Sequence, residues 1–89
     1  MSQTASKEPH KTTLTPAQLR AARAMLNWTR KELRAVSGIS VETIKNIECG
    51  KFAPHAATIG KITQCFSAHG VEFIGQHGVL LMLKGENQS

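Results

Sequence analysis

Three helix-start signals follow one another closely in the first half of the sequence, and they constrain the fold more than any other feature. The segments "TPAQ" (15–18) and "TRKE" (29–32) each place a threonine three residues before a glutamine or glutamate, which is the pattern of a capping box. In "SGIS", Ser40 can cap a third helix, and Gly38 can take the left-handed conformation that ends the second. The sequence therefore predicts three short helices, over 16–26, about 30–37 and about 41–49.

Apolar periodicity extends this prediction to the rest of the chain. A fourth helix is expected over 56–69, closed by Gly70, and two strands over 71–74 and 79–83, joined by a glycine-containing turn. The second strand is apolar at every position, so both of its faces need cover, and one small domain can cover only one of them. The side chains expected in the core are Leu19, Ala22, Leu26, Leu33, Val36, Ile44, Ile47, Glu48, Ile59, Ile62 and Phe66.

Charge and composition limit the classes of function. The 89 residues carry 11 Lys and Arg against 6 glutamates, and four of the five excess positive charges fall within 14–55. This balance favours a polyanionic partner such as nucleic acid. The chain has no aspartate and no glycine-rich phosphate loop, so we expect no enzyme and no cofactor.

The cysteines and the apolar runs predict a compartment. Cys49 and Cys65 form no CxxC pair, and the spacing of Cys65 and His69 does not resemble a zinc module, so we expect a reducing environment and no metal. No apolar run reaches the roughly 18 residues that span a bilayer, and the first residues lack a signal-peptide core. We expect a cytoplasmic protein without membrane contact, associated with the nucleoid when it is bound to DNA.

The helix expected over 41–49 has two different sides. At about 100° per residue, Ile44, Ile47 and Glu48 share one side. The other side carries Glu42, Thr43, Lys45, Asn46 and Cys49. An asparagine amide can pair with adenine N6 and N7, lysine can donate to guanine, and glutamate can accept from cytosine. The arrangement alone fits an αα-hairpin of a helical bundle equally well, and these side chains favour a DNA-reading helix-turn-helix.

The run "LTPAQLRAARAMLNWTRKELRAVSGISVETIKNIECGKFAPHAATIGKITQCFSAHGVEFI" (14–74) resembles the helix-turn-helix regulators of the Cro and lambda-repressor type, also called the xenobiotic-response-element family. It is most similar to a small bacterial branch with the pattern "RAAR…W…EL…SG.S…TI..IE.G…P…T…I…GVEF". The resemblance implies a mainly α, four-helix lambda-repressor-like DNA-binding domain over 14–70. We expect a disordered tail over 1–13, a C-terminal β-hairpin for dimerisation over 71–84 and a second tail over 85–89.

The resemblance, together with the residue chemistry, predicts individual roles. Base contacts are expected from Val41, Glu42, Thr43, Lys45 and Asn46, and DNA backbone contacts from Thr29, Arg30, Lys31, Ser40 and Lys51. The resemblance further implies a largely buried ion pair between Arg23 and Glu48. Relatives usually carry a small residue where this chain has Arg34, so that either the second helix is rotated or Arg34 extends outward along the surface.

The expected function is a sequence-specific, double-stranded DNA-binding transcriptional regulator that acts as a homodimeric repressor of a palindromic operator, without a small-molecule ligand. Dimer contacts are predicted from Val71, Phe73, Val79, Leu81 and Leu83. The alternative from another class is a protein-interaction module, an antitoxin or anti-activator, that binds a partner protein through the apolar hairpin.

Overall fold

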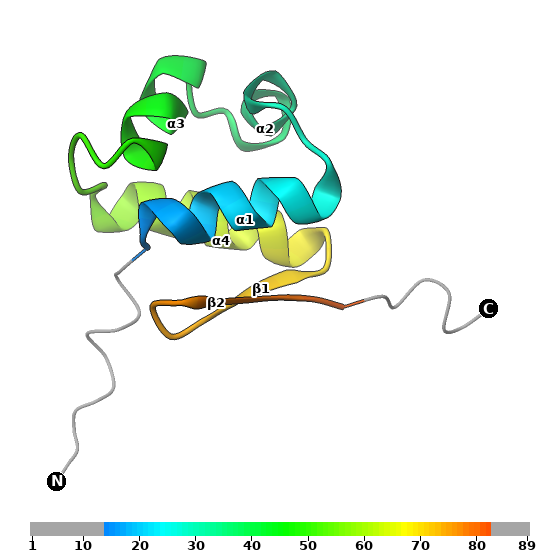
Figure 1. Cartoon of the computed structure of the whole chain (residues 1–89). Coiled ribbons are helices and arrows are strands. Elements are labelled where there is room, and N and C mark those ends of the chain that lie inside the picture. The colour runs from blue at the N-terminus through cyan, green and yellow to red at the C-terminus, as the bar shows by residue number, and fades with distance from the viewer. Residues whose placement is uncertain (1–13, 83–89) are drawn as a thin grey trace, which may run out of the picture.

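The computed structural model describes residues 14–82, in which four helices precede a two-stranded antiparallel hairpin. The elements are α1 (Pro16–Leu26), α2 (Arg30–Ser37), α3 (Val41–Glu48), α4 (Ala56–Ala68), β1 (Val71–Ile74) and β2 (Gly78–Leu81). They form three layers: α2 and α3 lie on one side of α1 and α4, and the hairpin lies on the other (Figure 1). The predicted mainly helical fold with a C-terminal hairpin is confirmed. The predicted tails at 1–13 and 85–89 lie outside the described residues.

Each of the first three helices begins at the cap expected for it. The Thr15 and Thr29 hydroxyls each accept a hydrogen bond from a backbone N–H three residues later, at 3.1 Å, and both capping boxes are complete. Ser40 caps α3 in the same way. Gly38 ends α2 with a φ of 78°, a left-handed conformation that costs a glycine little. These local signals set the short helices and the turns between them.

The core lies between the layers and is made of one side of each helix. Its fully buried members include Leu19, Ala22, Leu33, Ile44, Ile47, Ile62 and Phe66. The Trp28 ring packs beside Phe66, with 5.4 Å between ring centroids. Trp28, in the turn between α1 and α2, therefore extends the core.

Helix α2 buries less than the sequence predicts. Leu33 is buried, but Val36 is exposed, so its assignment to the core was wrong. The chain turns at Gly38, and Ile39 in that turn is buried instead, while Val36 borders a shallow groove between α2 and α4. Arg34 is exposed, which agrees with a side chain that extends outward.

The hairpin turns one apolar face to the core and leaves the other open. Val71 pairs with Leu81, and Phe73 with Val79, so these four side chains share a face. Val71 is fully buried and the other three pack against the core. The opposite face carries Ile74, Leu80 and Met82, which are 53 %, 47 % and 42 % exposed, together with the half-buried Glu72, which pairs with Leu80.

Among the side chains expected at a dimer interface, Val71 is fully buried in its own chain, and Phe73, Val79 and Leu81 are half-buried. Val71, Phe73, Val79 and Leu81 are held against their own chain, because β1 lies along α4 and β2 along α1. Leu83 lies outside the described residues. The apolar surface open to a second molecule is the face of Ile74, Leu80 and Met82.

Gln18 joins α1 to the hairpin turn. Its Oε1 accepts the backbone N–H of Thr15 at 3.1 Å, which completes the capping box. Its Nε2 donates to the carbonyls of Gly75 at 3.1 Å and Gly78 at 3.0 Å, and the side chain is almost fully buried. The Gln18 amide therefore provides hydrogen-bond partners for backbone groups both at the start of α1 and in the turn of the hairpin.

We expect Gln18→Glu to lower the free energy of unfolding by about 2–4 kcal/mol. The glutamate keeps an acceptor for Thr15 but places a second oxygen against the Gly75 and Gly78 carbonyls, which lose their donor. Urea unfolding followed by circular dichroism measures the change. Gln64→Glu, on the exposed side of α4, is the control and should stay within about 0.5 kcal/mol of the wild type. Equal stability of the two variants would contradict the assigned role of Gln18.

Candidate nucleic-acid interface

Helix α3 separates its buried side chains from its accessible ones. Ile44, Ile47 and Glu48 are buried and fix the helix to the core. Glu42 and Lys45 are exposed, and the other expected base-contacting residues, Val41, Thr43 and Asn46, are half-buried. α3 lies in the layer farthest from the hairpin (Figure 1).

The first turn of α3 carries two linked hydroxyls. Ser40 Oγ accepts the Thr43 backbone N–H at 3.1 Å and donates to Thr43 Oγ1 at 3.0 Å. The Thr43 hydroxyl keeps its own proton for another acceptor. The cap that starts the helix therefore also presents a donor at its accessible side.

Glu48, the last residue of α3, is the centre of an arginine cluster. Its carboxylate accepts two hydrogen bonds from Arg23 of α1, from Nε at 2.6 Å and from Nη2 at 2.9 Å. Arg30 of α2 donates its Nε to the same carboxylate at 2.9 Å. Arg20 Nη1 donates to the Glu48 backbone carbonyl at 2.6 Å. The first three helices therefore meet at a single residue.

The sequence indicated the Arg23–Glu48 contact through family resemblance, but it did not indicate the other two arginines. Arg30 was expected only at the DNA backbone, and Arg20 was given no role. Arg23 also donates Nη1 to the Trp28 carbonyl at 2.8 Å, which fixes the turn between α1 and α2. The signal in the sequence was the spacing of arginines along α1, since Arg20 and Arg23 lie three residues apart and share a side of that helix.

Opposing effects act on the pKa of the Glu48 carboxyl. Burial disfavours the charged form and by itself raises the pKa, but the hydrogen bonds and charges of Arg23 and Arg30 outweigh it, so the pKa lies below its ordinary value. The hydrogen bond with Glu48 raises the pKa of Arg23. The Arg23–Glu48 pair is therefore fully charged at neutral pH.

The residues expected at the DNA backbone lie at the starts of α2 and α3 and in the loop after α3. The Arg30–Glu48 ion pair joins the first residue of α2 to the last residue of α3. Lys51 lies in the loop after α3, and its backbone N–H donates to the Asn46 carbonyl at 2.8 Å. Thr29, Lys31 and Lys51 are exposed. One hydroxyl and two cations of this set are therefore open to solvent.

Two further exposed residues adjoin this surface. Phe52, in the loop after α3, is exposed and borders a hollow that Thr43 also lines. The sequence gave no reason to single it out, since its position depends on how that loop folds back. Cys49 is an exposed free thiol at the end of α3.

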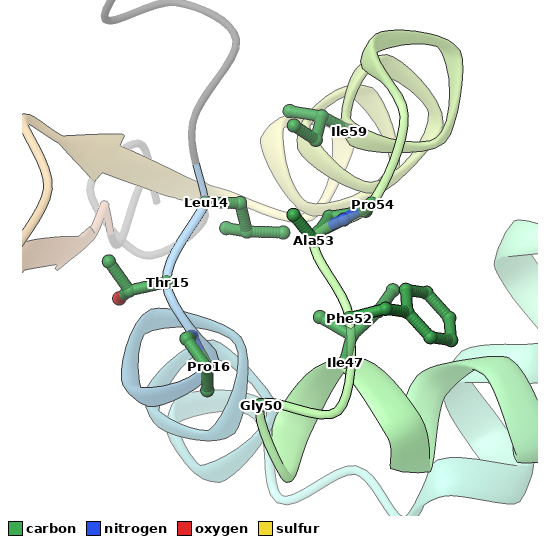
Figure 2. Close-up of a pocket in the computed structure, with 9 residues that line it drawn as sticks. All are labelled: Leu14, Thr15, Pro16, Ile47, Gly50, Phe52, Ala53, Pro54 and Ile59. Atoms are coloured by element: carbon green, nitrogen blue, oxygen red, sulfur yellow. The ribbon is translucent and has the colours of Figure 1, made fainter.

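An apolar cavity of about 380 Å³ lies behind the loop, between the start of α1, the end of α3 and the start of α4. Figure 2 shows its lining residues: Leu14, Thr15, Pro16, Ile47, Gly50, Phe52, Ala53, Pro54 and Ile59. None of them has an ionisable side chain, so this cavity offers no general acid, base or charged nucleophile.

Residues 14–82 contain neither a membrane-spanning helix nor a cluster of metal-binding side chains. No helix in that part of the chain is long and apolar enough to cross a membrane. Within the same residues, no group of three or more His, Cys, Asp or Glu side chains lies close enough to hold a metal ion.

Helix α3 is capped, has a buried apolar side and an accessible polar side, and follows α2 through a glycine turn. This arrangement, with basic residues at the start of α2 and in the loop after α3, is that of a helix-turn-helix DNA-binding domain. Residues 19–71 match the family model HTH_3, described as Helix-turn-helix. This match covers more than half of the chain, and the chain belongs to this Cro/C1-type helix-turn-helix family of DNA-binding transcription regulators, which are not enzymes. No curated protein matches the chain.

We expect Glu48→Gln to lower the free energy of unfolding at pH 7 by about 3 kcal/mol, because it leaves two arginines without a counter-charge. The folded-state pKa of Glu48 is lowered, so its stabilising effect is complete above the unfolded pKa of about 4.3 and is lost as the pH falls through the folded pKa. The difference between variant and wild type should therefore shrink below about pH 4. Denaturant unfolding from pH 3 to 7 measures it, and equal stability at pH 7 would contradict the assignment.

Proposed function

We propose that this regulator binds a palindromic operator as a homodimer and represses transcription by occluding a promoter. The observation that carries the proposal is α3, whose inner side is fixed to the core while its polar side stays accessible. The family supports DNA binding and transcription regulation. Repression, the dimer and the palindrome are the proposed part.

The dimensions and side chains of α3 support its entry into the major groove. Its eight residues give a length of about 12 Å, close to the roughly 12 Å width of that groove. We assign base reading to Val41, Glu42, Thr43, Lys45 and Asn46. Asn46 is the strongest member, because its amide offers a donor and an acceptor together and suits an adenine edge.

Backbone contacts are assigned to Thr29, Arg30, Lys31, Ser40 and Lys51. They stand at the starts of α2 and α3 and in the loop after α3, where hydroxyls, cations and helix N-termini suit phosphate oxygens. Such contacts fix the orientation of the domain and carry no sequence information themselves.

Asn46→Ala should weaken binding to the selected site by roughly 10-fold and leave binding to unrelated DNA unchanged, because it removes a base contact. Lys51→Ala should weaken binding to both and reduce the salt dependence by about one phosphate contact per chain. Selection of bound sites from random DNA supplies the operator, and fluorescence anisotropy over a range of salt concentrations gives the affinities. A wild-type protein that selects no sequence would refute sequence-specific binding.

The open face of the hairpin supports the proposed dimer. Ile74, Leu80 and Met82 gather three large exposed apolar side chains on one small sheet. Exposure of an apolar face of a two-stranded sheet to water is unfavourable, and a second copy related by a two-fold axis can cover that face. Two α3 helices about 34 Å apart would then read successive major grooves of a palindrome.

Leu80→Glu should give a monomer at micromolar concentration and weaken operator binding by about 100-fold, because a charge replaces the centre of the open face and the second site is no longer tethered. Analytical ultracentrifugation and anisotropy measure the two effects. Val36→Glu, an equally exposed apolar position on α2, is the control for assembly and should leave the oligomeric state unchanged. A wild-type monomer would remove this part of the proposal.

The same face supports a second candidate, a module that captures a partner protein, as an antitoxin or anti-activator does. Exposed Ile74, Leu80 and Met82 suit either role. One experiment distinguishes the two candidate functions. Purified protein that binds its operator as a dimer favours the regulator, whereas a monomer that binds its operator only with a co-purified chain favours the partner-binding module.

A further inference from the structure

We infer that Glu48, a residue of the core, positions Arg30 for DNA backbone binding and thereby couples the packing of three helices to DNA affinity. This inference rests on the proposed function and adds a positioning residue to it. Neither the sequence nor the family match gave Arg30 a second role. The geometry of the ion-pair cluster carries the argument.

A guanidinium such as that of Arg30 has five N–H donors in a fixed plane. Glu48 Oε1 takes the one on Nε at 2.9 Å, and within residues 14–82 neither Nη1 nor Nη2 of Arg30 has a recorded partner. The Nε bond limits the positions that the guanidinium can take, and the N–H groups at the outer edge of the guanidinium, on Nη1 and Nη2, point away from Nε. They form a pair suited to two phosphate oxygens.

The two arginines share a single carboxylate. The cluster of Arg23, Arg30 and Glu48 holds two positive charges and one negative charge, so one positive charge is left over. The Glu48 side chain is 1 % exposed and that of Arg23 is 19 % exposed, whereas that of Arg30 is 36 % exposed. Arg23 already gives the carboxylate two hydrogen bonds and the Trp28 carbonyl a third. Of the two arginines that pair with the Glu48 carboxylate, Arg30 is therefore the more open to an anion.

Arg30 is the first residue of α2, where a long side chain without a partner samples many rotamers. An ion pair that already holds the side chain in the free protein removes part of this entropy cost before DNA arrives. A lysine at this position could not serve both partners in this way, because its single ammonium is a point charge without a fork.

The test compares Arg30→Ala and Arg30→Lys in operator binding over a range of salt concentrations. We expect both variants to lose roughly 10-fold in affinity and to reduce the salt slope by about 0.9 per chain, since the lysine ammonium is taken by Glu48. Both should fold normally, because Arg23 still pairs with Glu48 in each, and circular dichroism checks this.

Two controls separate the possible causes. Arg34→Lys, at an exposed position later in α2, should keep the wild-type slope and shows that an Arg/Lys exchange on this helix is harmless by itself. Lys61→Ala, exposed on α4, removes one charge away from the interface and should also keep the slope.

The outcomes are distinct. If Arg30→Lys binds like the wild type while Arg30→Ala does not, Arg30 contacts DNA without needing Glu48, and the inference is wrong. If both variants keep the wild-type slope, Arg30 is a structural ion-pair partner alone, and the inference is also wrong. If the wild-type protein shows no salt-dependent DNA binding, the proposed function itself fails.

Discussion

The Glu48 carboxylate receives hydrogen bonds from arginines of two other helices, and the placement of α1, α2 and α3 depends on it. A buried carboxylate is costly to desolvate, and the surrounding arginines compensate for that cost only in one relative arrangement of the three helices. The accessible side of α3 is polar and contributes little to its own anchoring. Its orientation is therefore set by Ile44 and Ile47 together with this charged cluster on its inner side.

The parts of the fold that follow from neighbouring residues could be predicted from the sequence. The capping residues Thr15, Thr29 and Ser40 and the turn at Gly38 act within a few positions, so they gave the first three helices to within a residue. The buried and accessible sides of α3 followed from the helical period. The roles of the individual residues at DNA remain predictions, because no contact with DNA is part of the structure.

The parts that depend on distant residues could not be predicted in this way. An all-apolar β2 does not reveal which of its faces turns inward, and the register with Val71 and Phe73 decides it. The prediction that Val36 is buried was wrong for a similar reason, because the path of the chain after Gly38 brings Ile39 to the core instead. The second partner of Glu48 required the crossing of α2 and α3, which sequence spacing alone does not give.

The amide of Gln18 has a consequence that extends beyond its own neighbourhood. It fixes the hairpin turn to the start of α1, and Arg23, on the same helix, is fixed to the end of α3. A continuous series of rigid contacts therefore runs from the hairpin to the helix proposed to read DNA, with no flexible linker between them. In a dimer joined at the hairpins, the distance between the two half-sites would be determined by the folding of each monomer, and the DNA would have to adjust to the protein.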